Sequence, residues 1–548
     1  MTPPSCDALT GTDCFLRTDS VINNQWPLRK RGYAVAEKVV RHVPADAFAT
    51  GADPEMSLLG LDIGTTHCKA AVFDEAGKTL ATAALPSPRS TIAGATVYAV
   101  EHLWETVRAV SAACCSALPE GTITTIGIAS MAETGLLLDP ASGVARTPFL
   151  PWFDTAATRA AQLLVDNLAE GEALARFGVQ PTFKCGLAKL LHLGDSEPRL
   201  LDGARWLSVA DYVAFRLTGV LATDETLAGR TCAFNLAARA WDHEWLARFD
   251  LTTTIFPPVS PSGTPIGVTG RGAREAGLSA GIPVAIGGHD HLCALIGAGV
   301  GTPGQALDSM GTAEVLAGVC APGRLGTRAG HTGLAFGVMP LTGTRYWLGG
   351  LSSAGGALDW LRGILGTPPL SYAELAALQA PLSPEPGELL FLPYLAGSGA
   401  PLPNPASRGA FIGLAAEHGR ADLLKAVLEG TAYQLEAIRR AAASLTGTPP
   451  ESIIVTGGGA RNPRWVQIKA DVYGVPLDVR AADEAALLGA ALIAGVGCGR
   501  YPDAATALAC AAARPCERVE PDPARHRRYA DHFDRHYLPW QGHLVSEG

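Results

Sequence analysis

The strongest hydrophobic pattern of the chain lies in Leu58 to Leu80, LLGLDIGTTHCKAAVFDEAGKTL. Apolar residues alternate with small or polar ones, break at Gly64-Thr65-Thr66, resume, and break again at Glu75 to Lys78. Short apolar runs separated by turn residues predict an antiparallel meander of strands. Asp62, at the end of the first predicted strand, is a polar residue that a buried strand does not explain.

Further along the chain, apolar segments with strand and helix periods follow one another. A helix is predicted at Glu101 to Ala117, and a buried strand at ITTIGIASM, Ile123 to Met131. Strands that alternate with amphipathic helices along the whole chain indicate a mixed α/β fold. Because 548 residues are too many for one hydrophobic core, we expect two large lobes.

The second half of the chain contains an echo of the opening pattern. QALDSMGTAEVLAGV, Gln305 to Val319, again places a Gly-Thr turn between two apolar runs. One interpretation is an internal duplication in which each half offers a hairpin to one cleft. The other is coincidence, since Gly-Thr turns are common, and the echo alone does not decide between them.

Residues 1–55 show little periodicity and end directly before Met56 and the first strong strand. We predict a flexible N-terminal extension there. A second interpretation, in which translation of the native protein starts at Met56, is equally consistent with the sequence. The N-terminal peptide of the native protein would decide between them.

Composition limits the classes of protein to which this chain can belong. With 47% hydrophobic and 17% charged residues the chain can bury cores, and it is too apolar to be disordered. A net charge of −9 without a basic stripe argues against nucleic-acid binding. Twelve cysteines without a C-x-x-C pair indicate reduced thiols in the cytoplasm. The longest apolar run, from Ala485, is too short and glycine-rich to span a membrane.

The chemistry of the opening turn suggests a phosphate site. A tight turn at Gly64 exposes backbone N–H groups, and Thr65 and Thr66 add hydroxyl donors that suit phosphate oxygens. Asp62 then makes sense as a carboxylate that holds a hydrated Mg²⁺ against those phosphates. The structural alternative is an Asp that only caps a turn, which for an isolated D-x-G-T-T pattern is the commoner case.

Later segments, in order, resemble the FGGY family of carbohydrate kinases, within the actin and hexokinase ATPase-like group. The resemblance covers roughly Leu58 to Gly499. The similar segments are GLDIGTTHCKAAVFD, SVADYVAFRLTG followed by TDETLAGRT, GIPVAIGGHDHLCALIGAGV, SMGTAEVL, GAFIGLAAEHGRADLLKAVLEGTAYQL, and VTGGGARNPRWVQIKADVYGVPL. Each motif alone is of moderate specificity, whereas their order together is highly specific.

The resemblance implies an α/β fold of two ribonuclease-H-like (actin-like ATPase) lobes, mixed sheets flanked by helices, with an interlobe cleft. We expect an extension at 1–56, an N-terminal domain at 57–300 with the sugar site and first phosphate hairpin, a nucleotide-binding C-terminal domain at 301–510, and a tail at 511–548.

The implied activity is ATP-dependent phosphorylation of a hydroxyl on a small ketose or polyol in sugar catabolism, with ATP and Mg²⁺ as cofactors. The partner is then a small sugar or polyol, not a nucleic acid or a membrane, in the cytoplasm, and a homodimer is one possible assembly. An alternative is a non-catalytic sugar- or nucleotide-binding protein on the same fold. An actin-like or Hsp70-like ATPase would share the hairpins but does not predict the segment at 409–435.

The resemblance also assigns roles to individual residues. Asp290, in GGHDH, is the expected general base, and its structural alternative is a helix N-cap. The expected metal residue is Asp62. The residues expected at the nucleotide are Thr65, Thr66, Lys69, Gly311, Thr312, Gly355, Gly458, Gly459 and Asn462. Those expected to line the sugar are Glu133, Trp152, Asp154 and Asp290.

The expected sugar loop, SMAETGLLLD, departs from the relatives. Glu133 stands where glycerol kinases place a glutamate and xylulokinases a histidine, while Ala132 stands where these place Arg and Met. The loop therefore matches neither class and leaves the substrate open. His289 and His291 flank the expected base, but without a third ligand nearby in sequence we expect hydrogen bonding and no zinc.

Overall fold

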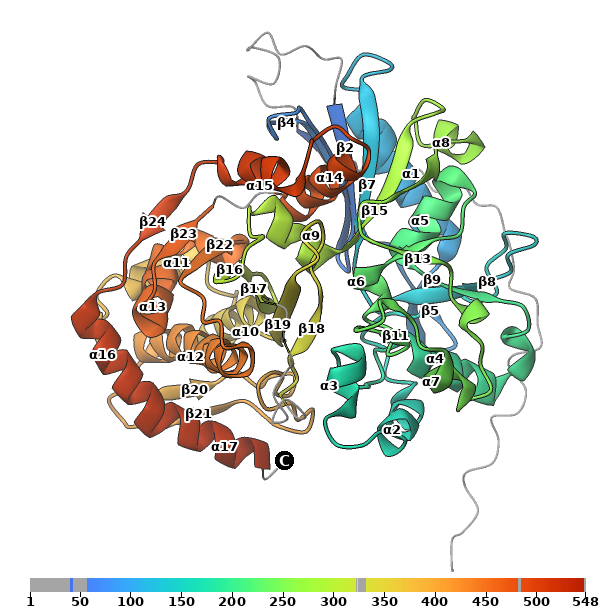
Figure 1. Ribbon diagram of the computed structural model, residues 1–548. Helices are drawn as coiled ribbons and strands as arrows, with labels where there is room; N and C mark the ends of the chain where they lie inside the picture. Colours follow the sequence, from blue (N-terminus) through green and yellow to red (C-terminus); the bar gives the residue numbers. More distant parts are fainter. Residues whose placement is uncertain (1–39, 43–56, 322, 324–331, 481–483, 547–548) are drawn as a thin grey trace, which may run out of the picture.

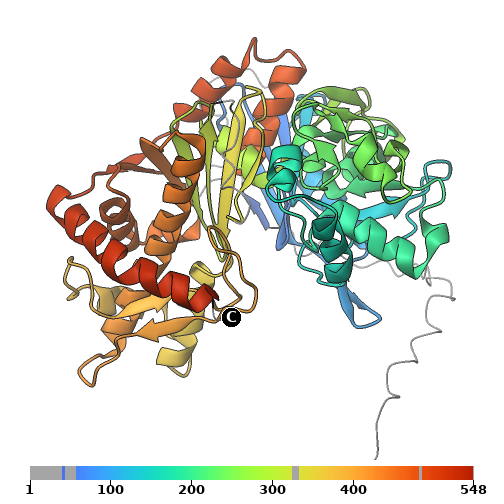
Figure 2. The ribbon, with the colours of Figure 1, turned by 60° about the horizontal axis from the view of Figure 1, so that its bottom comes forward.

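The computed structural model describes residues 40–42, 57–321, 323, 332–480 and 484–546. They form two lobes, each built on a mixed seven-stranded sheet (Figure 1). Turning the molecule brings the lower parts of both lobes forward and shows the C-terminal helices along the edge of the second lobe (Figure 2). The predicted two-lobed α/β class is confirmed.

The first sheet has the strand order β1-β4-β3-β2-β7-β15-β14. Its strands are β1 (Val40–His42), β2 (Ser57–Ile63), β3 (His67–Phe73), β4 (Thr79–Pro86), β7 (Ile123–Ser130), β14 (Pro265–Val268) and β15 (Pro283–His289). β2, β7 and β15 are parallel neighbours, and the remaining pairs are antiparallel.

The second sheet has the order β18-β19-β17-β16-β22-β23-β24. Its strands are β16 (Gln305–Met310), β17 (Glu314–Cys320), β18 (Ala335–Val338), β19 (Arg345–Leu351), β22 (Ser452–Thr456), β23 (Leu477–Val479) and β24 (Glu517–Val519). β16, β22 and β23 are parallel and the other pairs antiparallel, as at the corresponding positions of the first sheet. The repeat of order and direction supports the duplication interpretation of the hairpin echo over coincidence.

The opening segment forms the predicted antiparallel meander. Gly64 N donates to His67 O over 3.0 Å in the first turn, and Asp74 N donates to Lys78 O over 3.0 Å in the second. In the β2–β3 pair Asp62 lies opposite Lys69. The turn residues therefore set a register that brings a carboxylate and an ammonium to the same end of the hairpin.

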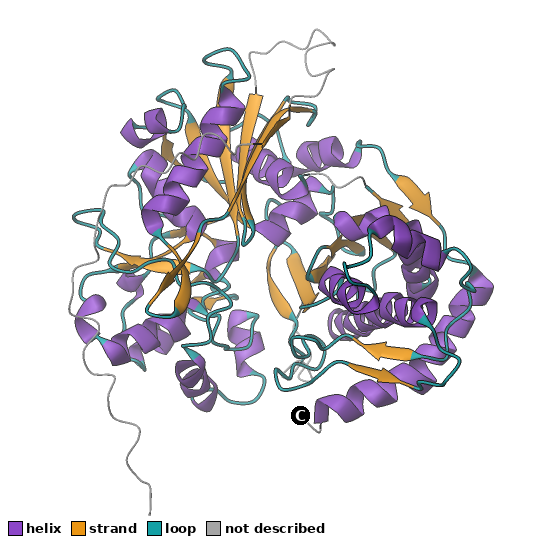
Figure 3. Ribbon diagram, turned by 180° about the vertical axis from the view of Figure 1, so that it is seen from behind, coloured by secondary structure: helices purple, strands orange, loops and turns teal. Residues whose placement is uncertain are grey.

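Helices cover the faces of both sheets (Figure 3). On the first sheet, α1 packs on β3 and β4, which confirms the predicted helix within two residues, and α5 packs on β7 and β15. α5 begins with a capping box between Ser208 and Asp211. The bounds of the helices used below are α1 (Val100–Cys115), α2 (Thr158–Asp166), α3 (Glu172–Phe177), α4 (Gly186–Ser196), α5 (Val209–Thr218), α6 (Glu225–Ala228), α7 (His243–Ala247) and α9 (Asp290–Gly297).

In the second lobe the longest helix, α12, packs against β19 and β20. The bounds here are α10 (Gly355–Leu365), α11 (Tyr372–Gln379), α12 (Arg420–Thr446), α13 (Pro463–Tyr473), α14 (Ala485–Gly497), α15 (Ala504–Ala512), α16 (Pro523–His532) and α17 (Leu538–Ser546). Short elements complete the fold: β5 (Arg89–Ile92), β6 (Ala95–Tyr98), β8 (Gly135–Leu138), β9 (Arg205–Ser208), β20 (Leu390–Leu392) and β21 (Ala410–Ile412).

The apolar run from Ala485 forms α14, which leaves the second sheet and packs on the first. It contacts α9 and the strands β2, β7 and β15. Its approach is so close that a Cβ on Gly60 would lie 2.1 Å from Leu487 O, and one on Gly489 would lie 1.7 Å from Cys293 O. The glycines in and around this run therefore serve helix packing. Within the described residues, no helix combines the length and apolarity needed to cross a bilayer.

The two ends of the chain differ. The segment expected as a tail, 511–548, adds β24 to the second sheet and continues into α16 and α17. Tyr529, Phe533 and Tyr537 are at most 1% exposed in the core of that lobe, so most of this segment is an integral part of it. Of the N-terminal extension, Val40–His42 pairs with β4, and the rest lies outside the described residues.

Candidate active site

Three acidic residues meet at one edge of the first sheet. Asp62 is next to last in β2, Glu133 follows β7, and Asp290 follows β15. Because these strands are parallel neighbours, their carboxyl ends share one edge, the usual place for ligands in such sheets. The sequence analysis named all three residues, and the structure brings them together.

Asp62 is held in an unusual state. Its Oδ1 is buried and has no hydrogen-bond partner among the described residues. Burial, with the negative charge of Asp290, raises the pKa of Asp62 to about 8, although nearby Lys69 opposes the rise. Lys69 itself forms an ion pair of 2.9 Å with Glu484, the residue before α14. A buried, unpaired carboxylate beside a second acid suits a cation as its partner.

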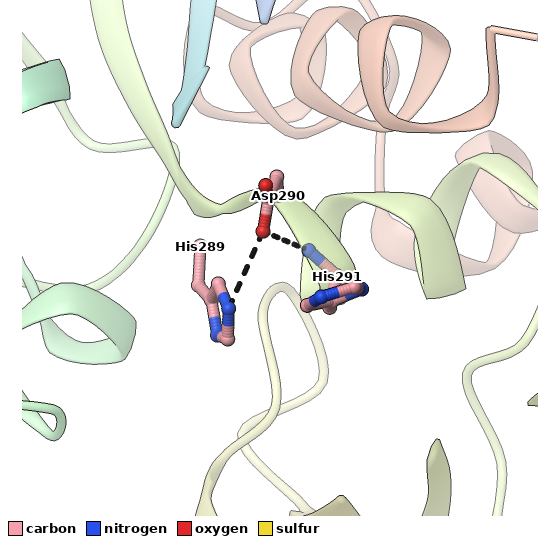
Figure 4. A group of neighbouring side chains, drawn as sticks. All are labelled: His289, Asp290 and His291. Atoms are coloured by element: carbon pink, nitrogen blue, oxygen red, sulfur yellow. Dashed lines mark hydrogen bonds and ion pairs between the residues drawn. The ribbon is translucent and has the colours of Figure 1, made fainter. Parts of the chain in front are cut away.

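Asp290 is the first residue of α9, so the N-cap position belongs to His289 (Figure 4). Asp290 Oδ1 accepts from His291 N at 2.8 Å and lies 3.3 Å from His289 Nε2. Burial, with Glu133 adding to it, raises the pKa of Asp290 to about 7. The residue can therefore take up and release a proton near neutral pH, which a helix cap does not require.

Asp224 and Thr226 fix the backbone that leads to Asp290. His289 N donates to Thr226 Oγ1 over 2.8 Å, and Thr226 Oγ1 donates to Asp224 Oδ2 over 2.7 Å. Gly288 has φ +114°, and a Cβ there would lie 2.1 Å from Thr226 Oγ1. Glycine is therefore needed before the H-D-H triplet, because the strand end turns against this hydrogen-bonded pair.

The two histidines lie close enough to Asp290 to form a candidate metal cluster, with ligand atoms within 4.8 Å of one another. Burial lowers the pKa of His289 well below its usual value and that of His291 to about 4. Both imidazoles are therefore neutral at pH 7. His289 already contacts the proposed base, so the expectation of hydrogen bonding without zinc stays a prediction.

Glu133 is ion-paired with a residue that the sequence analysis did not single out. Its Oε1 accepts from Arg230 Nε over 3.0 Å and from Arg230 Nη2 over 2.5 Å. Burial alone would raise the pKa of Glu133, but Arg230 and two lysines outweigh it and hold that pKa below its usual value. Glu133 also has φ +63°, a strained conformation for a residue with a side chain. Its carboxylate is therefore charged and fixed in place.

Lys189 supports the loop that carries Glu133 through hydrogen bonds to backbone carbonyls. Its Nζ donates to the carbonyls of Glu133 (2.7 Å), Leu150 (3.1 Å) and Pro151 (2.7 Å). The side chain is buried, and burial lowers the pKa of Lys189 to about 8 in spite of Glu133. One lysine thus joins the Glu133 loop to the segment that carries Trp152.

Trp152 and Thr65 contact each other. Trp152 Nε1 donates to Thr65 Oγ1 over 2.9 Å, and Lys184 Nζ lies 5.1 Å from the centroid of the Trp152 ring. The Thr65 hydroxyl therefore links the first turn to the expected sugar wall. Thr66 is exposed at the tip of that turn. Asp154 Oδ1 accepts from Ala156 N at 3.0 Å in a local turn.

The second hairpin places Gly311 and Thr312 at its turn, between β16 and β17. Gly355 N donates to Gly311 O over 3.1 Å, and Gly356 N donates to Thr312 O over 2.9 Å. A Cβ on Gly355 would lie 2.5 Å from Gly311 O. Gly355 therefore supports the Gly311-Thr312 turn directly, and its expected contact with the nucleotide stays a prediction.

Gly458, Gly459 and Asn462 follow β22, which is a parallel neighbour of β16. A Cβ on Gly459 would lie 2.9 Å from Met310 Cβ, whereas one on Gly458 would meet nothing within 4 Å. Asn462 Oδ1 accepts from Trp465 N at 3.2 Å and caps α13. Gly458 alone of the three thus faces open space, while the other two also serve the local fold.

Arg230, Lys184, Lys189 and Glu484 are the charged site neighbours that sequence reasoning missed. Arg230 stands in the segment TDETLAGRT, which resembles a motif of the family, but the sequence assigned no role to this arginine. Lys189 lies in the apolar stretch GLAKLLHL, where a lone lysine was a usable signal of a buried partner. Nothing local marks Glu484, which is 415 positions from Lys69.

The chain matches two family models in sequence. The N-terminal domain of the FGGY family of carbohydrate kinases matches residues 57–297, and the C-terminal domain of that family matches residues 330–498. The first match holds the three acidic residues described above, and the second holds Gly355, Gly458, Gly459 and Asn462.

Individual proteins give the same result. The chain is 32% identical to a glycerol kinase from Gloeobacter violaceus over 90% of this chain and 97% of the relative. It is 29% identical to the xylulose kinase of Escherichia coli over 80% and 89%. The solved structure of a xylulose kinase from Rhodospirillum rubrum superposes with a TM-score of 0.80 at 26% identity, over 89% of this chain and 99% of that structure.

Proposed function

Because the chain belongs to the FGGY family of carbohydrate kinases, we propose that it transfers the terminal phosphoryl group of Mg-ATP to a hydroxyl of a small ketose or polyol, with Asp290 as general base. The observation that carries the residue assignment is the position of Asp290: it lies at the strand edge shared with Asp62 and Glu133, and its pKa is raised to about 7.

In this proposal Asp290 accepts the proton of the attacking hydroxyl. A general base works best when its pKa is close to the working pH, and burial supplies that shift here. His289 and the backbone of His291 hold one carboxylate oxygen. The second oxygen is left to face the substrate. Because the carboxylate is already held in position, it needs little reorganisation before it accepts the proton.

The two turns bind the phosphate groups from opposite lobes. In the first turn Thr65 and Thr66 offer backbone N–H groups and Thr66 also offers its hydroxyl, and in the second turn Thr312 offers both. The N–H groups of Gly64 and Gly311 are bonded within the turns and fix their shape. Lys69 adds a positive charge beside the first turn. Gly458 presents open backbone for the nucleotide.

The residues present fit a magnesium ion. Asp62 has a buried oxygen without a partner in the described part of the chain, and burial together with the neighbouring Asp290 raises its pKa. Asp62 would hold the ion through the hard oxygen ligand that Mg²⁺ prefers. When bound, Mg²⁺ supplies neutralisation of the phosphate charge.

The sugar would lie against Glu133, Trp152 and Asp290. Glu133, fixed by Arg230, offers a charged acceptor to sugar hydroxyls, and the aromatic face of Trp152 suits the apolar face of a sugar. Asp154 lies two residues after Trp152, in a local turn of the same segment. The relatives named glycerol kinase and xylulose kinase define the class of small polyol or ketose.

The experiment is coupled ADP release across a panel of pentuloses, hexuloses, polyols and deoxy sugars, with ³¹P NMR of the product. We expect turnover with at least one member, dependent on Mg²⁺, and formation of a phosphate monoester. The matched control is Asp290→Asn on the same panel. Folded protein that binds ATP yet turns over no member would contradict the proposal and favour a non-catalytic binding protein.

A further inference from the structure

Two buried cysteines face each other beneath the sugar loop. Cys185 and Cys232 are 3% and 0% exposed, and their sulfur atoms lie 2.8 Å apart. They are 47 positions apart in sequence, so the fold and not the local sequence brings the two thiols together. Both are free cysteines.

The backbone around the pair is firmly held. Leu187 N donates to Thr231 O over 2.9 Å, so the start of α4 is bonded to the residue before Cys232. Trp245 Nε1 donates to Cys232 O over 3.0 Å, and Cys232 has φ +58°. These contacts keep the two sulfurs in reach of each other and limit their separation by thermal motion.

The two thiols differ in the direction in which their surroundings shift the pKa. The hydrogen bond from Cys232 is the largest influence on Cys185 and, despite burial, lowers the pKa of the Cys185 thiol. Burial raises the pKa of Cys232 well above its usual value, and its role as donor to Cys185 adds to that rise. The thiolate is the reactive form of cysteine, so this difference in pKa favours Cys185 as the thiol that reacts first.

Gly186 and Thr231, the chain neighbours of the two cysteines, line a small cavity together with Glu133 of the sugar loop and its partner Arg230. The cysteine pair therefore lies one residue from the wall of that cavity.

We propose that Cys185 and Cys232 are a redox modification site, at which peroxide forms a reversible disulfide bond beside the sugar loop. Cys185 sulfur attacks one peroxide oxygen, the O–O bond breaks, and Cys185 sulfenic acid and water result. Cys232 sulfur then attacks Cys185 sulfur; the S–S bond forms, the S–O bond breaks, and the leaving hydroxide takes the Cys232 proton as water. Two thiols and one peroxide give one disulfide and two waters, and a dithiol reductant restores both thiols.

The consequence for the sugar site rests on the proposed function. Arg230, two residues before Cys232, holds Glu133, and Lys189 on α4 holds the backbone of the same loop. A disulfide imposes its own geometry on the residues it joins, so it constrains the Arg230 segment against the start of α4. We expect the oxidised enzyme to have a KM for sugar about three- to tenfold higher, the scale of weakening one buried polar contact, with the KM for ATP unchanged.

The test begins with the full-length wild-type protein, reduced and then treated with hydrogen peroxide. Free thiols are alkylated after denaturation, and digested peptides are analysed by mass spectrometry. We expect a linked peptide that contains Cys185 and Cys232 and disappears on reduction with dithiothreitol. The site is overturned if both cysteines alkylate fully while exposed Cys516 is oxidised. This readout needs neither a variant nor kinase activity, so it is separate from the test of the proposed function.

Variants then test the division of roles. In Cys232→Ser we expect no linked peptide, a Cys185 sulfenic acid that dimedone traps, and sugar kinetics that no longer respond to peroxide. Cys516→Ser, which removes a remote exposed thiol, should behave as wild type. Trapping at Cys232 in Cys185→Ser and not at Cys185 in Cys232→Ser would reverse the roles and contradict the proposal. A linked peptide without any change in sugar KM would refute the effect on the sugar site.

Discussion

The two hairpins β2–β3 and β16–β17 occupy equivalent places in equivalent sheets, yet they use their acidic residues in opposite ways. In the first, Asp62 stands two residues before the turn glycine Gly64; in the second, Asp308 stands three residues before Gly311. Side chains alternate between the faces of a strand, so this offset of one residue sends the two carboxylates to opposite faces. Asp62 joins Asp290 and Glu133 at the site, and Asp308 points into the interior of its lobe.

The interior charge of the second hairpin is paired. Lys469 on α13 is 0% exposed and contacts Asp308 at 2.8 Å and Glu314 at 2.5 Å. Tyr473 OH adds a hydrogen bond of 3.2 Å to Asp308. Burial, with Asp308 adding to it, raises the pKa of Glu314 well above its usual value. Lys469 thus ties the second hairpin to α13.

The comparison teaches how one scaffold separates chemistry from structure. An acid left without a partner, as at Asp62, lowers stability but can bind a cation. An acid paired with a buried lysine, as at Asp308, cannot bind ligand but holds two elements together. The first hairpin should therefore respond to substitution in activity, and the second in stability.

The largest effect is expected at the first-lobe edge, for Asp290→Asn. Asn has nearly the same size, so the fold should persist, whereas loss of a general base typically lowers the rate about 10² to 10⁴-fold. We expect turnover to fall at least about a hundredfold with a near-normal melting temperature and retained ATP and sugar binding. Steady-state kinetics and a thermal melt on one preparation check this, and turnover within a few-fold of wild type would remove Asp290 as the base.

Next in size is Lys469→Met in the second hairpin. It leaves two buried acids without their cation, and breaking such a pair typically costs about 3 to 5 kcal/mol of stability. Urea unfolding measures this.

The matched control is Lys69→Met in the first hairpin. Its partner Glu484 and Lys69 itself are about one-third exposed, so the stability change should stay below about 1 kcal/mol. Here the KM for ATP should rise instead, because Lys69 is expected to lie near the phosphates. Equal destabilisation by the two substitutions would break the comparison between the hairpins.

A smaller effect is expected for Glu133→Ala. It removes the sugar acceptor and leaves Arg230 without its partner, so sugar use should weaken by about 1 to 3 kcal/mol. ATP affinity should barely change. Glu172→Ala, which removes an ion pair with Arg176 within α3, serves as the control. Unaltered sugar kinetics in Glu133→Ala would assign Glu133 to the scaffold.

The smallest effects concern pH. Because the pKa of Asp290 is raised to about 7, the basic form is lost as pH falls through 7, and turnover should fall with it. Asp62 has a folded-state pKa of about 8, above its unfolded value. Its contribution to stability is fully present only below the ordinary pKa of 3.8, and it is lost progressively as the pH rises from there to about 8.

Asp62→Asn should therefore raise the melting temperature relative to wild type in the absence of Mg²⁺, and by more at pH 9 than at pH 6. Thermal melts at both pH values check this. A lower melting temperature for the variant at pH 9 would show that Asp62 stabilises the fold, as Lys469 does in the other lobe.

Much of the architecture followed from local patterns. The meander at Leu58 to Leu80, the helix after it and the strand at Ile123 were predictable, because alternation and turn residues act over a few positions. The order of the motifs predicted the family, and the grouping of Asp62, Glu133 and Asp290 then agreed with the structure. Their individual roles stay predictions.

The sequence was enough to predict the α/β class and the kinase family, both of which are confirmed, and to name three acidic residues that the structure brings together. The residues that pair with these acids were not predictable from it. Arg230 reaches Glu133 across 97 positions and Lys469 reaches Asp308 across 161, and no local pattern encodes such pairs. The path of α14 onto the first sheet is of the same kind, since its glycines matter only where another backbone approaches them. Contacts between distant segments depend on how whole helices and strands pack against each other. That packing exists only in the folded chain, so local sequence patterns do not specify it.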